Sequence, residues 1–116
     1  MTENECQLGH KKEIMAVHDA MDVLNGKWKI SIVSSICYHN KRRFSDILND
    51  VQGISNKMLS KELKELEINK LVQRTVLETQ PISVQYQLTE YGLTLKTIIS
   101  NLAKWGMEHR KVIIGK

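Results

Sequence analysis

Apolar and polar positions between Gly53 and Glu67 repeat with the period of an amphipathic helix. At about 100° per residue, leucines project from one side of such a helix and lysines from the other. The apolar face consists of Leu59, Leu63 and Leu66, and the basic face consists of Lys57, Lys61 and Lys64. Ser55 is suited to cap this helix, because its hydroxyl can accept a hydrogen bond from a first-turn N–H group. The pattern is typical of a DNA-recognition helix. In such a helix the leucines anchor the helix in the protein core and the lysines face the DNA phosphates.

The same segment also fits a surface helix whose lysines are merely solvated. Glu62, Glu65 and Glu67 favour this alternative, because they can pair with lysines at helical spacing and dilute the positive charge. The segment alone leaves both interpretations open. The flanking segments are needed to choose between them.

A hairpin pattern follows this helix. Residues 73–77 and 83–88 are two β-rich runs, separated by a break that contains Pro81, and the second run alternates apolar and polar positions. A last helix is predicted to open at residues 89–92. This order of helix, hairpin and helix is that of a winged helix-turn-helix, in which the hairpin flanks the recognition helix.

The helix expected before the recognition helix is residues 44–50, with Ser45 as its N-cap and Gln52-Gly53 as the joining turn. The basic run at residues 41–43 comes directly before it and could hold the DNA backbone, although such a run is often only a solvated turn. The predicted fold is therefore mainly α with a small β-hairpin wing, and its terminal helices are expected to form a dimer interface.

Apolar stripes at both ends of the chain carry the dimer prediction. They repeat at helical spacing, and the last helix has more apolar surface than a single small domain can cover. A second subunit would bury the excess and set two recognition helices side by side. The expected interface comprises Ile14, Val17, Met21, Leu95, Ile98, Leu102 and Trp105. The alternative is that the last helix is only a wide core helix.

Several motifs, in order and spacing, resemble those of one regulator family. They are Asn25-Gly26-Lys27-Trp28, Arg43-Phe44, Gly53-Ile54-Ser55, Lys57-Met58-Leu59, Leu63-Lys64-Glu65-Leu66-Glu67 and Val84-Gln85-Tyr86-Gln87-Leu88-Thr89-Glu90-Tyr91-Gly92. From about Met15 to Trp105 the chain is similar to the HxlR-type winged helix-turn-helix regulators, relatives of the MarR group. The resemblance implies a homodimeric bacterial DNA-binding regulator without enzymatic activity, of genes often involved in redox or electrophile responses.

The chain departs from that family pattern at two places. Family members commonly carry a sensing cysteine just ahead of the first helix, where Met15 stands here, and Cys6 lies well upstream. Cys6 is therefore a weak candidate for a redox thiol, and an unreactive tail thiol is the favoured interpretation. In the wing, Ser83 stands where an arginine is common, which leaves Arg74 as the main wing-side cation.

Length and composition fit one small regulator domain. The chain has 116 residues, 41% of them hydrophobic, and a formal net charge of +4, which suits a polyanion partner. We expect a polar leader at residues 1–11, the domain at residues 12–111 and a tail at residues 112–116. The N-terminus does not resemble a signal peptide and the chain has no run able to span a bilayer, so the expected location is cytoplasmic.

Other chemistry finds little support in the sequence. The histidines are dispersed, with no cysteine or carboxylate at zinc-site spacing, and phosphate loops and nucleophile motifs do not occur. We therefore expect no metal, no cofactor and no enzyme. Cys37 lies on an apolar face of the predicted helix and is expected to be a small buried hydrophobic residue. Trp28 is expected to anchor the core.

The sequence thus predicts a transcriptional regulator that binds duplex DNA as a homodimer. The expected DNA-binding residues are Arg42, Arg43, Ser55, Asn56, Lys57, Ser60, Lys61, Lys64 and Arg74. The competing hypothesis is a winged-helix protein–protein interaction module without sequence-specific DNA binding. Such a module would need an acidic or apolar recognition face, which the lysine pattern does not offer.

Overall fold

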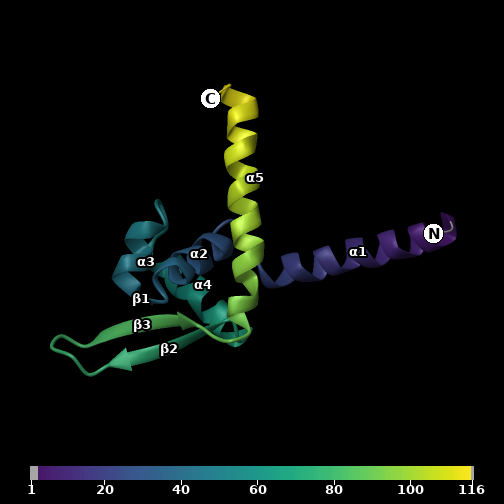
Figure 1. The fold of residues 1–116 in the computed structure, drawn as a ribbon. Coiled ribbons are helices and arrows are strands. Elements are labelled where there is room, and N and C mark those ends of the chain that lie inside the picture. Colours follow the sequence, from purple (N-terminus) through teal and green to yellow (C-terminus); the bar gives the residue numbers. More distant parts are fainter. Residues whose placement is uncertain (1–2, 116) are drawn as a thin grey trace.

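The computed structural model describes residues 3–115, with side chains from residue 9 onward. In order, the chain forms α1 (Glu3–Val23), α2 (Lys29–His39), β1 (Lys41–Arg43), α3 (Phe44–Asp50), α4 (Asn56–Ile68), β2 (Val72–Leu77), β3 (Ser83–Leu88), the 3-10 helix η1 (Gly92–Leu95) and α5 (Lys96–Ile114). Figure 1 shows a body of α2, α3, α4 and the hairpin, from which α1 and α5 project. This is the predicted winged helix-turn-helix.

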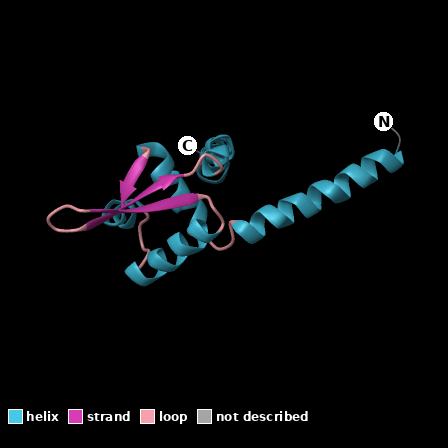
Figure 2. Cartoon of the chain, turned by 90° about the horizontal axis from the view of Figure 1, so that it is seen from below, coloured by secondary structure: helices cyan, strands magenta, loops and turns pink. Residues whose placement is uncertain are grey.

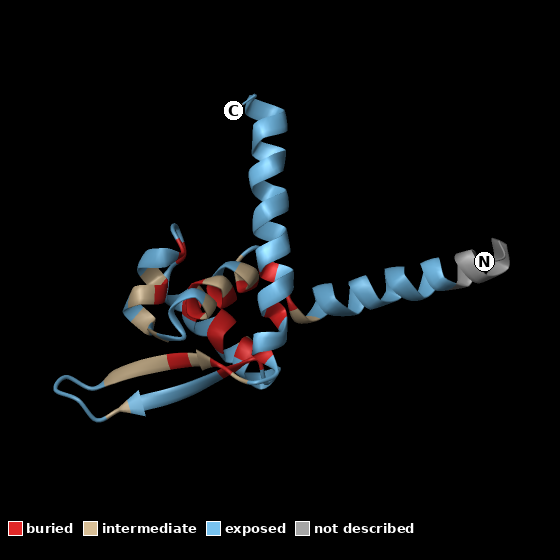
Figure 3. Cartoon of the chain, viewed as in Figure 1, coloured by how far each residue is buried: buried red, intermediate tan, exposed pale blue. Residues whose placement is uncertain are grey.

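The hydrophobic core lies where α2 and α4 meet the sheet. Leu59, Leu63 and Leu66 of α4 are buried in it, so the leucine face predicted from the sequence is confirmed. They share this core with fully buried side chains of α2 such as Ile32, and Trp28 packs against its edge as expected. In Figure 3 the buried residues gather in this body.

The turn between α3 and α4 depends on Gly53, which adopts a left-handed backbone conformation with φ of +89°. A side chain is strained in that conformation, which explains why a glycine stands in the turn before α4. The prediction that Ser45 caps α3 is wrong: the helix begins at Phe44, so Ser45 lies inside its first turn and Arg43 occupies the cap position.

The wing is a three-stranded antiparallel sheet of order β1-β3-β2, not a simple hairpin. The basic run at residues 41–43, for which a solvated turn was the alternative to a DNA-backbone contact, forms strand β1. In it Arg42 pairs with Tyr86 of β3, and Tyr86 pairs in turn with Arg74 of β2. Asn40, with φ of +63°, reverses the chain between α2 and β1. The sequence did not reveal this strand because three basic residues carry no alternating apolar pattern.

The last helix starts later than predicted. Residues 89–92 form a tight connection, in which the Gly92 N–H donates to Thr89 Oγ1 at 2.9 Å, and η1 precedes α5. This connection anchors the helix in the body, so Leu95 is only 8% exposed and Ile99 only 6%. Both residues belong to the domain core and not to a free dimer face, which corrects the sequence-based assignment of Leu95.

The terminal helices leave the body in different directions (Figures 1 and 2). Helix α1 begins at Glu3, so residues 3–11, expected as a polar leader, continue the same helix as the apolar stripe. Ile14, Val17 and Met21 are exposed along α1, as are Ile98 and Leu102 along α5. Their apolar faces are therefore open in the isolated chain.

Candidate nucleic-acid interface

The N-terminus of α4 is built as the sequence predicted. Ser55 stands at the cap position, and its Oγ accepts a hydrogen bond of 3.1 Å from the Met58 N–H. The helix that this cap starts buries its leucines against α2 and turns its polar residues outward. Those exposed residues are Asn56, Lys57, Ser60, Lys61 and Lys64. Side chains of this kind can donate to phosphate oxygens and to base edges in a major groove.

Two glutamates of α4 contact α2 and do not pair with the lysines that helical spacing places near them. Glu62 and Glu65 turn toward α2 and both accept hydrogen bonds from the ammonium of Lys29. The lysine side chain is only 1% exposed, and its Nζ also donates to Asn25 Oδ1 at 3.1 Å. Glu62 therefore points away from the lysine face, and the interpretation that it dilutes the charge of that face is wrong. Glu65 is drawn toward Lys29, but at 37% exposure it still lies near Lys61, whose charge helps to lower its pKa.

Electrostatics hold this cluster in its charged form. Burial lowers the pKa of Lys29, but the hydrogen bonds and charges of Glu62 and Glu65 outweigh it and raise that pKa above the ordinary value. The hydrogen bond from Lys29 lowers the pKa of the Glu65 carboxyl. The sequence did not point to Lys29, because it sits among apolar residues of α2 and only its partners on α4 explain its burial.

A groove of about 560 Å³ separates α4 from the wing. Ser60 and Lys64 line it from the helix and Arg74 from β2, so three predicted DNA-binding residues come together there. Glu67 also lines it, and is the acidic residue of α4 that does face this region. Burial raises the pKa of the Tyr86 hydroxyl at the floor of the groove, despite the nearby Arg74.

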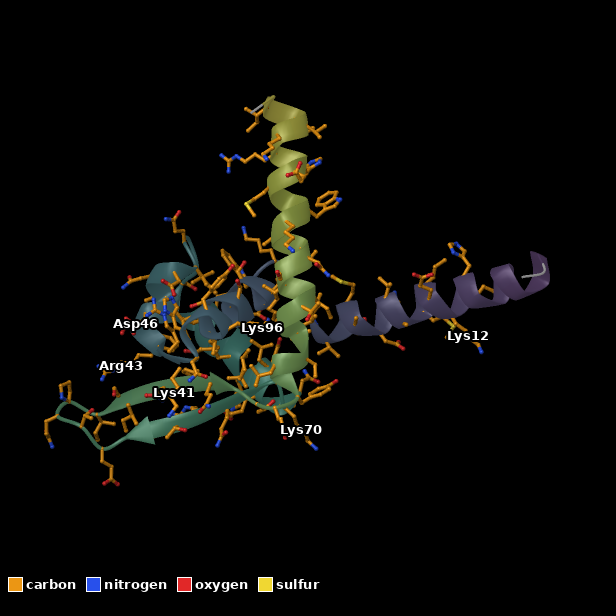
Figure 4. The ribbon with its side chains drawn as sticks, viewed as in Figure 1. Lys12, Lys41, Arg43, Asp46, Lys70 and Lys96 are labelled. Carbon is orange, nitrogen blue, oxygen red and sulfur yellow. The ribbon has the colours of Figure 1, made fainter. Side chains whose placement is uncertain are left out.

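The two arginines of β1 have different surroundings. Arg42 makes two hydrogen bonds of 2.9 Å to the carboxylate of Asp50, which also accepts a 2.7 Å hydrogen bond from Ser35 Oγ. The Ser35 hydrogen bond, with the help of Arg42, holds the pKa of Asp50 below its usual value. Arg42 therefore joins β1 to the end of α3, whereas Arg43 is exposed (Figure 4).

The remaining sequence candidates lie elsewhere. Trp105 is exposed on α5 and stacks on His109, with ring centroids 4.9 Å apart. Cys37 is half-buried against the core, which agrees with its expected packing role. Cys6 lies outside the residues whose side chains are described. Among the described side chains, no three His, Cys, Asp or Glu residues are grouped to hold a metal ion.

Comparison with known proteins agrees with this geometry. Residues 23–113 match the profile of the HxlR-like helix-turn-helix family. The chain belongs to this family. It is 35% identical over 105 residues to the HTH-type transcriptional regulator YtcD of Bacillus subtilis. The matched region covers 90% of this chain and 82% of YtcD. It is 34% identical over 89 residues to the regulator YodB of the same organism, covering 77% of this chain and 79% of YodB.

A solved structure shares the fold. The redox regulator HypR in its reduced form superposes with a TM-score of 0.72 at 35% identity, covering 87% of this chain and 99% of HypR. The HxlR-family chain is thus an HTH-type transcriptional regulator and not an enzyme. No helix within residues 3–115 is long and apolar enough to cross a lipid bilayer.

Proposed function

We propose that this regulator binds duplex DNA as a homodimer, with α4 in the major groove and the wing beside it. The observation that carries the proposal is the exposed lysine face of α4, from which Glu62 is withdrawn by its buried ion pair with Lys29. The contacting residues are Arg43, Ser55, Asn56, Lys57, Ser60, Lys61, Lys64 and Arg74. Arg42 has a supporting role, because its guanidinium is engaged by Asp50.

The homodimer is supported by the open apolar faces of the two terminal helices. Ile98 and Leu102 on α5 and Ile14 and Val17 on α1 are about half exposed or more in the single chain. Since each is already about half buried, covering it with a second copy should contribute about 1 kcal/mol, roughly half the value for a fully exposed side chain. Two-fold symmetry would then present two recognition helices to half-sites about 34 Å apart, one helical turn of DNA.

The DNA-binding proposal is tested by replacing Lys57 and Lys61 with alanine. Since both are exposed and opposite the buried leucines, folding should be retained while affinity for a duplex selected from a random pool falls. Each lost phosphate contact should also reduce the salt slope by about 0.9. The matched control is the Lys11→Ala/Lys12→Ala variant, which changes the net charge equally but on α1 (Figure 4).

The control decides between a local and a general effect of charge. It should keep nearly the affinity and salt slope of the wild type. Equal losses in both variants, or none in the α4 variant, would contradict the assignment of α4. The competing protein–protein module predicts no salt-dependent mobility shift of duplex DNA by the wild type.

We also infer that DNA binding does not depend on the Cys6 thiol. HypR is a redox regulator, and its likeness to this chain makes oxidant control the obvious expectation. Two features of the sequence oppose that transfer. Met15 stands at the usual sensor position of the family, and Cys6 lies upstream of it.

A further inference from the structure

A buried charge cluster connects α2 to the recognition helix. Lys29 is 1% exposed in its side chain, and its carboxylate partners Glu62 and Glu65 are 8% and 37% exposed. Removing an ammonium and a carboxylate from water costs several kcal/mol per ion, which their attraction only partly offsets. An apolar residue at position 29 would avoid this cost. The presence of a lysine there points to a role other than stability.

The position of Glu65 on α4 suggests that role. Glu65 lies at the boundary between the buried leucines and the lysine face, and it follows Lys61 by one helical turn. At 37% exposure its carboxylate is close enough to the surface to turn outward if it lost its partner. It would then move closer to Lys61, whose charge already helps to lower the Glu65 pKa, and would repel an approaching phosphate. The hydrogen bond from Lys29 holds it on the α2 side instead.

Lys29 is itself fixed from the opposite direction. Its Nζ donates to Asn25 Oδ1, and the Asn25 side-chain amide donates to the Asp22 carbonyl at 2.7 Å, in the last turn of α1. The lysine is therefore held between the end of α1 and the side of α4. This bracing keeps the ammonium at a fixed place, from which it draws both carboxylates inward.

We propose that Lys29 is a positioning residue for DNA binding, which holds the carboxylates of Glu62 and Glu65 against α2 and away from the phosphate backbone. The inference rests on the proposed function of α4 as the recognition helix. It goes beyond that function because Lys29 does not touch DNA. Its effect on affinity is exerted through Glu65, whose charge it directs.

Two variants separate this effect from simple destabilisation. Lys29→Met alone would leave Glu62 buried without its cation and is expected to unfold the domain. The Lys29→Met/Glu62→Gln variant keeps the interior neutral and releases Glu65. The Lys29→Met/Glu62→Gln/Glu65→Gln variant removes the released charge as well. Thermal unfolding followed by circular dichroism establishes that the double and the triple variant are folded at the assay temperature.

Affinity is then measured on a duplex selected by the wild type from a random pool. The double variant should bind about tenfold more weakly, because a carboxylate now faces the phosphates. The triple variant should recover to within about twofold of the wild type. A double variant as tight as the wild type, or a triple variant no tighter than the double, would overturn the proposal.

A second measurement does not involve DNA. The Glu65 carboxyl is titrated by carbon NMR in the wild type and in the double variant. Its pKa is expected below the ordinary value in the wild type and higher in the double variant, where the Lys29 hydrogen bond is lost and the charge of Lys61 remains. An unchanged titration would refute the role of Lys29. If the wild type bound no duplex, the proposed function would fail while this titration still decided where Lys29 holds Glu65.

Discussion

The middle of the chain and its two ends differ in how far they bury their apolar side chains. Within the described residues, every buried hydrophobic side chain lies between Leu24 and Ile99. Outside that interval α1 and the rest of α5 expose theirs, among them Met21 and Trp105 (Figure 3). Both regions carry apolar residues at helical spacing, so the difference in burial comes from what the fold provides to cover them.

This difference in burial suggests that the middle forms the folded domain and that the ends form contacts with another molecule. The middle closes its own core with α2, α4 and the sheet, and so it fixes the position of α4 within a single chain. The ends project as helices and leave their apolar faces uncovered, and in the proposed homodimer a second copy would cover them. Exposed apolar patches of this kind mark interaction sites. The predictions below test this division, beginning with the largest expected effect.

A pair of glycines, one in each region, should respond oppositely to alanine. A Cβ on Gly92 would lie 2.0 Å from the carbonyl oxygen of Leu71, whereas one on Gly106 in α5 would meet no atom within 4 Å. Gly92→Ala should therefore cost about 3 kcal/mol or more, since backbone must move. Gly106→Ala should be neutral or stabilise by up to about 1 kcal/mol through helix propensity.

The measurement is urea unfolding of both variants at one protein concentration. A Gly92→Ala variant as stable as the wild type would show that η1 does not approach the Leu71 backbone as closely as described. A strongly destabilised Gly106→Ala variant would instead indicate that α5 is packed closely at that point, against a surface that the single chain does not contain.

A charge placed at either of two positions of α5 about one helical turn apart should separate the core from the proposed dimer face. Ile99 is buried in the body and Leu102 is 49% exposed. Ile99→Glu should unfold the domain. Leu102→Glu should leave it folded but weaken the dimer by several kcal/mol, because an unpaired charge would enter a desolvated seam.

Sedimentation over a range of concentrations tests this pair, with circular dichroism as the check on folding. The wild type should sediment as a dimer and Leu102→Glu as a folded monomer at micromolar concentration. A monomeric wild type, or an unchanged dimer in Leu102→Glu, would contradict the proposal that α5 forms the interface.

The sequence predicted the features that depend on local periodicity. The leucine face of α4, its Ser55 cap and the hairpin order all follow from spacing within a few turns of chain. What it missed depends on residues far apart. The inward turn of Glu62 requires Lys29, 33 positions away, and strand β1 exists only because β3 supplies its hydrogen-bond partners. Helical spacing alone assigned those glutamates to the surface.

A smaller effect is expected at the ion pair between β1 and α3. Because the pKa of Asp50 is lowered on folding, its contribution to stability is present above the unfolded value of about 3.9 and is lost as pH falls through the lower folded value. At pH 7, Asp50→Asn should cost about 1 kcal/mol, reduced by solvent screening since the side chain is 31% exposed.

Urea unfolding at pH 7 and at about pH 2.5 measures this dependence, since both pH values bracket the titration of an ordinary Asp. The difference between Asp50→Asn and the wild type should shrink at the lower pH. Asp46→Asn is the matched control, because Asp46 lies 3.8 Å from Arg42 and is more exposed (Figure 4). A larger loss of stability in Asp46→Asn than in Asp50→Asn would indicate that Asp46 is the main partner of Arg42.

The smallest effect is expected at the cysteines, one in each region. Cys37 is packed against the core of the middle, and Cys6 lies in the N-terminal segment, upstream of the vacant sensor position. Since neither fits the family's sensing position, diamide should change wild-type affinity for DNA by less than about twofold. Cys6→Ser and Cys37→Ser should bind as the wild type does. A large loss on oxidation that Cys6→Ser abolishes would restore a thiol switch, and would place control of DNA binding in the terminal region.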